Sequence, residues 1–306
     1  LQNKIMTLPG DTLVYPAHGP GSSCGKNLGP ETYSSIADEK KTNYALQPQS
    51  REEFIKAVTE GLVTPPLYFP INAKINKEGY ESLDEVLGAG LRPLTISELK
   101  KWILESDLIV LDTRESMLFT EGFVPGSINI GLDGRFAEWA GSLLPFDKPI
   151  VLVTDPGNEK ESVVRLARVG FSTMKGFLAG GFEHWKKAGE PIDLIVNVDA
   201  DELAVDLPFD PRLLVIDVRR ETEFADGHVR GAVNIPVSEL TDPATMANIE
   251  DTHNIYVHCA GGYRSIIASS MLKRQGIHNL RNITGGWKSI SEQPNIEIVK
   301  ENSVLN

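Results

Sequence analysis

The residues best suited to chemistry lie in one short segment, 255–265, which reads Ile-Tyr-Val-His-Cys-Ala-Gly-Gly-Tyr-Arg-Ser. An apolar strand runs into a glycine-rich turn, and the cysteine of that turn, Cys259, stands five residues before Arg264. Residues 266–275 have helical spacing, so the turn is expected between a strand end and a helix N-terminus. Unpaired amide groups gather at such a junction and favour an anion. The pattern therefore predicts an activated cysteine nucleophile.

Two alternative roles for these residues stay open. Cys259 fits a thiolate, because the helix dipole, the loop N–H groups and the guanidinium of Arg264 favour the charged form over the thiol. A free cysteine can also be a small buried hydrophobe. A core cysteine, however, does not require two following glycines, whereas amides that converge on an anion require a backbone free of side-chain bulk. Arg264, in turn, could serve only to tie the loop to a neighbouring carboxylate.

Four motifs occur in the order found in rhodanese-type sulfurtransferases, and this part of the chain resembles that family. The motifs are Asp217-Val218-Arg219, residues 227–236, residues 259–265 and Gly285-Gly286-Trp287. The resemblance implies that Cys259 accepts a sulfane sulfur as a persulfide, which Arg264 helps to stabilise. It also implies an anion cradle made by the loop residues Ala260, Gly261, Gly262, Tyr263 and Ser265.

Dual-specificity phosphatases of the cell cycle share this scaffold and provide a rival interpretation. Their loop from cysteine to arginine is one residue longer and accommodates a phosphate, whereas four residues separate Cys259 from Arg264 here. The shorter loop favours sulfur transfer over phosphate hydrolysis.

An internal repeat indicates two tandem domains of one fold. Asp112-Thr113-Arg114 recurs as Asp217-Val218-Arg219, at an offset of 105 residues (217 minus 112). Two further pairs share this offset, namely 126–130 with 231–235, and Gly180-Gly181-Phe182 with Gly285-Gly286-Trp287.

The two copies differ at the residue that would carry out the chemistry. In the first copy a strand from Ile150 leads into Asp155-Pro156-Gly157, so that Asp155 is expected at the position of Cys259. Aspartate cannot carry a sulfane sulfur, and Pro156 removes an amide donor from the loop. This copy resembles the inactive rhodanese modules of tandem sulfurtransferases, which implies a packing or docking role. A carboxylate nucleophile is the other interpretation.

Alternating strands and helices predict an α/β fold with two tandem rhodanese-like, doubly wound parallel-sheet domains. We expect the inactive domain at residues 91–193 and the catalytic domain at residues 194–306. The expected strands are 108–112, 127–130, 150–154 and 173–177 in the first copy, and 213–217, 232–235, 254–258 and 280–283 in the second. Because ligands bind beyond the carboxyl ends of parallel strands, Cys259 would lie at the binding edge.

Residues 1–90 belong to neither copy, and we expect part of another domain and a linker there. Segment 8–25 combines a turn, a short strand ending in His18 and a glycine-rich loop with Cys24. It resembles the C-terminal part of a metallo-β-lactamase αββα fold of the glyoxalase II and persulfide dioxygenase branch. The resemblance places His18 in or beside a metal centre, either as a ligand or in the outer shell. After a helix at 51–60, two consecutive prolines predict an extended connector to residue 79, with aromatic residues that pack on a neighbouring domain.

The metal site of that family is incomplete in this sequence. The His-x-His-x-Asp-His segment is absent, and His18 alone among six histidines falls in this region. Because a transition-metal site requires at least three protein ligands, we expect no metal cofactor in this chain, and iron or zinc only in an intact first domain. The sequence begins at Leu1 without an initiator methionine, which we interpret as an N-terminally truncated form.

Composition is typical of a cytoplasmic protein of a reducing compartment. Two cysteines in 306 residues leave no disulfide framework. No apolar run reaches the roughly 18 residues that span a bilayer, and no signal peptide opens the sequence. A net charge of −12 argues against a nucleic-acid partner, because a polyanion would be repelled. An incomplete first domain would expose part of a sheet, which favours a homo-oligomer.

Taken together, the motifs resemble a fusion of a metallo-β-lactamase-fold persulfide dioxygenase with tandem rhodanese domains. The resemblance implies a sulfurtransferase that moves sulfane sulfur from thiosulfate or a low-molecular-weight persulfide, through a Cys259 persulfide, to a thiol or sulfite acceptor. Two other classes stay open: a thioester hydrolase similar to glyoxalase II with rhodanese-like docking modules, and a protein whose two copies only dock partners.

Overall fold

The computed structural model of the chain describes residues 3–16, 32–59, 66–242, 245, 249 and 253–301. The chain divides into two compact units, Leu1–Thr64 and Pro65–Asn306. The second unit contains both copies of the sequence repeat, and it therefore holds the residues of interest for sulfur chemistry.

The first unit contains a short antiparallel ribbon and helices. Strand β1 (Leu13–Val14) pairs with β2 (Ser34–Ser35). The helical segments that follow are α1 (Ile36–Thr42), η1 (Tyr44–Leu46) and α2 (Arg51–Thr59). The Oγ of Ser35 accepts a hydrogen bond of 3.1 Å from the Asp38 N–H, which is a typical N-cap and fixes the start of α1. The helix predicted from residue 51 is confirmed.

Two helices follow the prolines, and the first of them shows that the extended connector predicted to residue 79 is wrong for most of that segment. They are α3 (Tyr68–Glu78) and α4 (Leu83–Gly90). Pro70 lies in the first turn of α3, where the backbone nitrogen has no intrahelical partner to lose. The predicted aromatic packing is confirmed, because Tyr68 lies so close to Gly141 of the first repeat copy that a Cβ there would meet its ring at 2.9 Å.

Within the described residues, the second unit contains two five-stranded parallel sheets with one strand order. From edge to edge, the first runs β3-β7-β6-β4-β5 and the second runs β8-β13-β12-β9-β11. The strands of the first sheet are β3 (Pro93–Leu94), β4 (Ile109–Asp112), β5 (Ile128–Asn129), β6 (Ile150–Val153) and β7 (Met174–Leu178). Those of the second are β8 (Val196–Val198), β9 (Leu213–Asp217), β11 (Val233–Asn234), β12 (Asn254–His258) and β13 (Leu280–Ile283). The shared order confirms the predicted tandem repeat.

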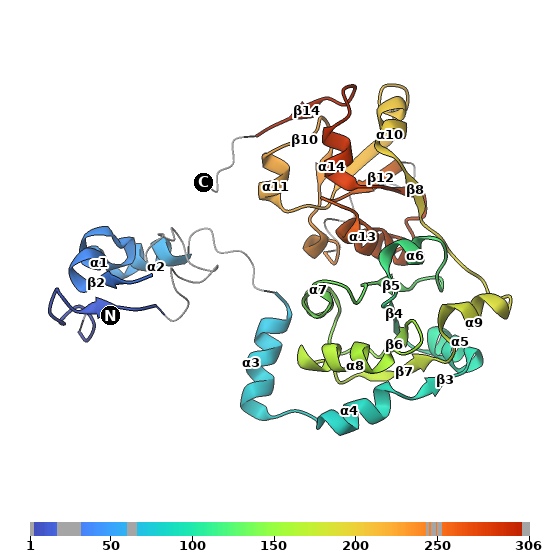
Figure 1. Cartoon of the computed structure of the whole chain (residues 1–306), viewed down its shortest axis with the longest axis horizontal. Helices are drawn as coiled ribbons and strands as arrows, with labels where there is room; N and C mark the ends of the chain where they lie inside the picture. Colours follow the sequence, from blue (N-terminus) through green and yellow to red (C-terminus); the bar gives the residue numbers. More distant parts are fainter. Residues whose placement is uncertain are drawn as a thin grey trace. The chain divides into compact units, whose positions relative to one another are not determined.

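Helices cover both faces of each sheet, as Figure 1 shows. Those of the first copy are α5 (Ile96–Glu105), α6 (Ser116–Thr120), α7 (Phe136–Leu143), α8 (Glu159–Arg168) and α9 (Gly181–Lys187). Those of the second are α10 (Ala200–Asp206), α11 (Glu221–Ala225), η2 (Val237–Glu239), α13 (Tyr263–Arg274) and α14 (Gly286–Ser291). An antiparallel ribbon of β10 (His228–Val229) and β14 (Ile298–Val299) is added to the second copy. Strands buried on both faces explain the continuous apolar runs of β4 and β6.

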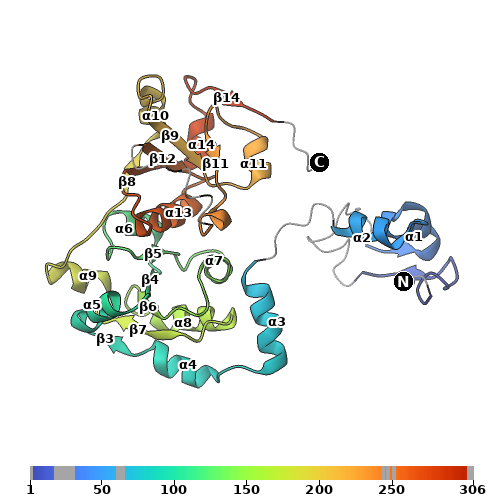
Figure 2. The ribbon, with the colours of Figure 1, turned by 180° about the vertical axis from the view of Figure 1, so that it is seen from behind.

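Helix α13 of the second copy lies against β5 and α6 of the first, as Figures 1 and 2 show from opposite sides. The Asn129 N–H donates a hydrogen bond of 3.0 Å to Ser270 Oγ on α13. The guanidinium of Arg274 at the end of α13 donates to the carbonyls of Gly126 and Leu108, at 2.8 and 2.9 Å. One hydrophobic core runs through both copies. The helix that follows the cysteine loop is therefore held from outside its own domain.

Candidate active site

Cys259 directly follows β12, at the carboxyl end of the second sheet, and α13 begins four residues later. The Gly262 N–H donates a hydrogen bond of 3.1 Å to the Cys259 Sγ. Gly262 has φ +116°, a conformation that residues with a Cβ rarely adopt, so this amide can face the sulfur only because the position is glycine. The first amides of α13 also have no intrahelical partner. The predicted junction of strand, glycine turn and helix is confirmed.

The residues that follow the buried Cys259 are small. Cys259 is only 1% exposed, whereas Ala260 and Gly261 above it are exposed. A Cβ built on Gly261 or Gly262 would meet no atom within 4 Å, so the space over both positions is open. A donor can therefore approach the loop without displacing a side chain from either glycine.

The carbonyl of Cys259 is bound by the start of α14. The Trp287 N–H donates to it at 2.6 Å, and the Lys288 N–H donates to the Ala260 carbonyl at 3.4 Å. A Cβ on Gly286 would lie 2.3 Å from the Cys259 oxygen, so this close approach requires glycine. The Gly285-Gly286-Trp287 motif thus orients the backbone of the cysteine.

His258, which the sequence did not single out, lies beneath the same carbonyl. It is fully buried, and its Nδ1 is 3.3 Å from the Cys259 oxygen. Burial lowers the pKa of His258, so its ring is neutral at neutral pH. Its Nε2 lies 3.7 Å from Asp217 Oδ2 and has no hydrogen-bond partner among the described residues. The position before the cysteine is the signal that could have identified this residue.

The Asp-Val-Arg motif forms a buried ion pair beside the loop. Arg219 donates to both oxygens of Asp217 at 2.6 to 3.0 Å and to the Gly227 carbonyl at 2.6 Å. Its guanidinium also stacks on the Trp287 ring, 4.3 Å from the centroid. The first copy repeats the pair with Arg114 on Asp112. Since both copies have it, the motif serves the fold and orients the glycine-tryptophan segment.

Arg264 lies on the first turn of α13, and its guanidinium is held by Glu223 of α11. Its Nη1 donates to Glu223 Oε2 at 2.7 Å and its Nη2 to Oε1 at 2.8 Å. The alternative that the sequence left open, an ion pair with a neighbouring carboxylate, is therefore present. Glu223 was missed because 41 residues separate the partners along the chain.

The side chains of Tyr263 and Ser265 point to structural partners. The Tyr263 hydroxyl donates to the Gly131 carbonyl of the first copy at 3.0 Å, and burial raises its pKa to about 12. The Ser265 hydroxyl is 2.8 Å from the Gly262 carbonyl and 2.6 Å from Asn282 Oδ1. Any part that these two residues take in an anion cradle is thus left to their main-chain amides.

Strand register identifies the residue of the first copy that corresponds to Cys259. The aspartates that end β4 and β9 pair with the last residues of the neighbouring strands, Val153 and His258. The next residues are Thr154 and Cys259, which therefore correspond. The prediction that Asp155 takes the cysteine position is wrong by one residue, because the offset of 105 continues without a gap into the loop.

Glycines in both copies support this correspondence. A Cβ on Gly181 would lie 2.8 Å from the Thr154 carbonyl oxygen, and one on Gly286 would lie 2.3 Å from the Cys259 carbonyl oxygen. The Thr154 hydroxyl is 3.3 Å from the Asp155 carbonyl. A hydroxyl, like a carboxylate, cannot hold a sulfane sulfur, so the corrected residue still argues against sulfur transfer by this copy.

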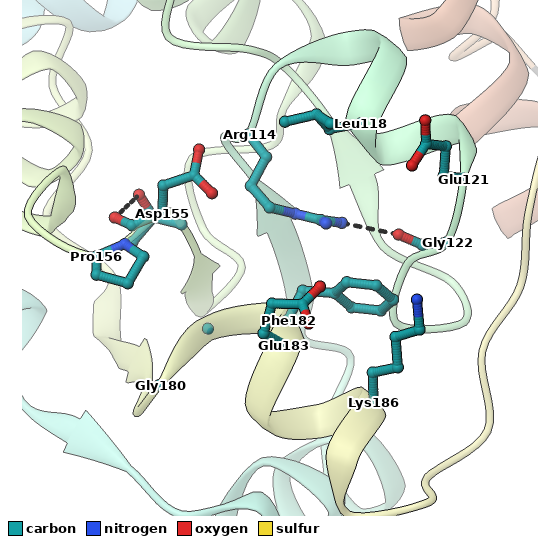
Figure 3. A pocket seen from close by; sticks show the side chains of 12 residues that line it. Arg114, Leu118, Glu121, Gly122, Asp155, Pro156, Gly180, Phe182, Glu183 and Lys186 are labelled. Carbon is teal, nitrogen blue, oxygen red and sulfur yellow. Dashed lines mark hydrogen bonds between the residues drawn. The ribbon is translucent and has the colours of Figure 1, made fainter.

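A cavity of about 260 Å³ occupies the corresponding place in the first copy. Figure 3 shows the Asp155 side chain on one side of the hollow and Lys186 on the other, with Arg114 and the Phe182 ring between them. The guanidinium of Arg114 is 4.2 Å from the ring centroid and donates to the Gly122 carbonyl at 2.9 Å. The first copy therefore repeats the contacts that Arg219 makes with Trp287 and Gly227 in the second.

The predicted metal residue His18 lies outside the described residues, as does Cys24. In the described ranges, no three side chains of His, Cys, Asp or Glu come together in a group that could hold a metal ion. These residues therefore do not form a site that fits iron or zinc. In the same part of the chain, no helix is long and apolar enough to cross a membrane.

A family model described as the rhodanese-like domain matches residues 95–188 and 199–293. Together these segments cover more than half of the chain, and they include every strand of the two sheets except the edge strands β3 and β8. The chain belongs to the rhodanese-like domain family. Its second rhodanese-like domain carries the cysteine at the loop described above, and its first carries threonine.

Known proteins and solved structures match only parts of the chain. The Bacillus subtilis protein YrkF is 30% identical over 115 residues, which are 38% of this chain and 60% of YrkF. A sulfurtransferase of Allochromatium vinosum is 27% identical over 93 residues, which are 30% of this chain and 85% of that protein. A crystal structure of a metallo-beta-lactamase from Staphylococcus aureus is 27% identical, covers 56% of this chain and 46% of its own, and gives a TM-score of 0.39. Rhodanese-like and sulfurtransferase proteins thus support sulfur transfer as the general chemistry.

Proposed function

We propose that this protein is a sulfurtransferase whose second rhodanese-like domain carries sulfane sulfur as a Cys259 persulfide. The observation that supports this most is the hydrogen bond of 3.1 Å from the Gly262 N–H to the Sγ at the start of α13. An amide aimed at sulfur at a helix N-terminus stabilises a negative charge there. The donor is thiosulfate or a low-molecular-weight persulfide, and the acceptor is a thiol or sulfite.

The reaction has two displacements. In the first, the Cys259 thiolate attacks the outer sulfur of the donor, a new S–S bond forms, and the donor's own S–S bond breaks. Its electron pair leaves with sulfite when thiosulfate is the donor, or with a thiolate when a persulfide is the donor. In the second, the sulfur atom of the acceptor attacks the outer sulfur of the enzyme persulfide, and Cys259 leaves as a thiolate. No net oxidation or reduction is required.

The loop amides stabilise the charge that moves between the two sulfur atoms, while Arg264 is paired with Glu223 at the edge of the loop. The outer sulfur lies where Gly261 and Gly262 leave open space, and the amides of Ala260 to Ser265 form its cradle. Trp287 fixes the Cys259 carbonyl on the opposite side, so that the amides and not the carbonyl face the sulfur.

The first rhodanese-like domain acts as a packing module in this proposal. Thr154 at the position of the cysteine supports the absence of sulfur transfer there, and the contacts of Arg274 and Ser270 support the packing role. Residues preceding it belong, in this proposal, to a metallo-β-lactamase-fold persulfide dioxygenase domain that binds iron or zinc when complete. Nothing in the described residues favours the thioester hydrolase.

Turnover with defined donors tests the proposal. We expect the wild-type chain to produce sulfite from thiosulfate, or a new persulfide from glutathione persulfide, in the presence of a thiol acceptor. Cys259→Ser should abolish turnover while its circular dichroism and thermal unfolding stay those of the wild type. Equal turnover in folded Cys259→Ser would refute the role of this residue.

A further inference from the structure

Glu223 and Arg264 form an ion pair at the edge of the cysteine loop. Two parallel hydrogen bonds of 2.7 and 2.8 Å join the guanidinium to the carboxylate. The side chains are 19% exposed for Arg264 and 34% exposed for Glu223, so the pair is only partly in contact with solvent. This forked arrangement has well-defined geometry and keeps the guanidinium turned toward α11.

Both partners are charged at neutral pH. The hydrogen bonds from Arg264, with a further one from the Arg220 N–H, lower the pKa of Glu223 to about 2. The hydrogen bonds to Glu223 are also the largest cause that raises the pKa of Arg264, and the charges of Cys259 and Asp217 raise it further. Arg264 is therefore close enough to respond to the cysteine charge, but its own positive charge is already balanced.

The other cations near the loop do not supply a free positive charge in place of Arg264. Arg219 is 3% exposed and bound to Asp217 by three hydrogen bonds. Lys288 meets the loop through its main-chain N–H, and its side chain is exposed, where water and salt screen its charge. The loop thus offers amide dipoles and a neutralised ion pair to an incoming donor.

The ion pair is specific to the second copy. Counting back by the repeat offset of 105 residues, Leu118 of α6 takes the position of Glu223, and Glu159 takes the position of Arg264. The first copy forms the same sheet and the same glycine turns without this pair. The fold therefore does not require it, which points to a role in the reaction of the second copy.

We propose that Glu223 determines donor specificity by neutralising Arg264, so that the site favours organic persulfides over thiosulfate. This inference rests on the proposed sulfur transfer. Thiosulfate carries two negative charges, so it is repelled by the thiolate of Cys259. A free cation beside the sulfonate-like end of thiosulfate is required to offset this repulsion. The persulfide group of R–S–SH or R–S–S⁻ carries at most one charge at the reacting sulfur atoms, on the sulfur that the loop amides receive, and the charges of R in glutathione persulfide lie on its peptide groups, farther from the reacting bond. Cys259 gains the outer sulfur, and the leaving group is the thiolate R–S⁻.

The test compares sulfur uptake from two donors by the whole chain. Single-turnover uptake by Cys259 is followed by intact-mass spectrometry with thiosulfate and with glutathione persulfide. In Glu223→Gln the side chain keeps its size, but Arg264 gains an unbalanced charge. We expect the second-order rate constant for thiosulfate to rise about tenfold at low ionic strength and to fall toward the wild-type value with added salt. The constant for glutathione persulfide should change by less than about twofold.

Two further variants distinguish the loss of the ion pair from the loss of any negative charge on α11 and from misfolding. Glu221→Gln removes the same charge from α11, two residues from the ion pair, and should leave both rate constants at the wild-type values. Glu223→Asp keeps the charge but is too short for both hydrogen bonds, so it should show a smaller rise with thiosulfate. Circular dichroism of each variant verifies folding.

The outcomes separate this inference from the function on which it rests. Uptake from both donors at comparable rates by the wild type, or no rise with thiosulfate in folded Glu223→Gln and Glu223→Asp, overturns the specificity role and leaves sulfur transfer intact. No sulfur uptake from either donor by folded wild-type protein overturns both.

Discussion

At the scale of single residues, the surroundings of Cys259 act mainly through main-chain groups. The Gly262 N–H donates a hydrogen bond to the sulfur of Cys259, and the Trp287 N–H and the His258 ring contact its carbonyl oxygen. Charged side chains form a second set around this backbone, where Asp217 and Glu223 each balance an arginine. The electrostatics of the loop is therefore set by the amides, and the ion pairs adjust it.

Stability should depend on pH through Glu223. Its pKa falls from 4.5 to about 2 in the folded chain, so the ionised carboxylate favours the folded state. This contribution is complete above the unfolded value and is lost as the pH falls from about 4.5 toward 2. We expect the difference in free energy of unfolding between wild type and Glu223→Gln to shrink between about pH 5 and about pH 3 in urea titrations.

The matched variant for this measurement is Glu221→Gln, on the same helix but outside the ion pair. Its difference from the wild type should vary much less over the same pH range. A difference for Glu223→Gln that stays constant with pH would show that the ion pair does not stabilise the folded state.

The sequence identified Cys259, Gly262 and Arg264 because the turn between strand and helix is contiguous. Glu223 could not be inferred in the same way, because no sequence pattern indicates which residue pairs with a single glutamate on a short helix. His258 is adjacent to the cysteine, but its burial depends on the packing of Trp287 and Asp217 from other segments.

At the scale of elements, the start of α14 and the cysteine loop are in contact through a glycine. Gly286 has φ +58°, and Gly181 has φ +60° at the corresponding contact in the first copy. An alanine at either position would clash with a loop carbonyl, at 2.3 and 2.8 Å respectively. These contacts allow one experiment on two equivalent sites.

We expect Gly286→Ala and Gly181→Ala each to lower the free energy of unfolding by roughly 1–3 kcal/mol, because both impose backbone strain. Only Gly286→Ala should slow sulfur uptake by Cys259, since it displaces the carbonyl opposite the sulfur. Denaturant unfolding and single-turnover uptake measure the two effects. Equal uptake by both folded variants would contradict the positioning role of α14.

Most strands were predictable from apolar runs that end in polar residues, and β9, β12 and β13 have the predicted bounds. The short edge strands β3 and β8 were not predicted, because no motif of the repeat includes them, whereas the similarly short edge strands β5 and β11 lie in the repeated segments 126–130 and 231–235. Helix α3 was missed because Pro65-Pro66 suggested an extended chain, whereas tertiary packing of Tyr68 and Ile75 on the first copy stabilises a helix directly after the prolines.

At the scale of the whole second unit, the cysteine loop is tied to the first copy by Tyr263. This residue follows Gly262 in the chain, and its hydroxyl donates to the Gly131 carbonyl. Tyr263→Phe removes this bond, and we expect a loss of about 1 kcal/mol in the free energy of unfolding. Sulfur uptake by Cys259 should also slow several-fold, because the amide of Gly262 is positioned by its neighbour.

Tyr256→Phe is the matched control. This variant also removes a hydroxyl that donates a hydrogen bond, in this case to the Asp206 carboxylate. Tyr256 lies in strand β12 and not in the loop. The variant should lose stability and keep the wild-type rate of uptake. If Tyr263→Phe behaves like this control, the contact between the copies only holds the domains together.

The tandem arrangement was predictable in full from the offset of 105 residues, but the interface was not. Residues of α13 such as Ser270 and Arg274 have polar side chains that bind main-chain groups of the first copy. Such contacts leave no periodic signal. The error of one residue in matching Asp155 to Cys259 has another origin, since the offset of 105 counted back from Cys259 already gives Thr154, and strand register confirms it.

Intact-mass spectrometry after incubation with a sulfane sulfur donor tests the central claim most directly. The whole chain is treated with glutathione persulfide, freed of excess donor and measured beside Cys259→Ser. We predict that the wild type gains the mass of one sulfur atom, that a thiol acceptor removes it, and that folded Cys259→Ser gains none. A wild-type mass that stays unmodified in the folded protein, or an equal gain in Cys259→Ser, would contradict the account.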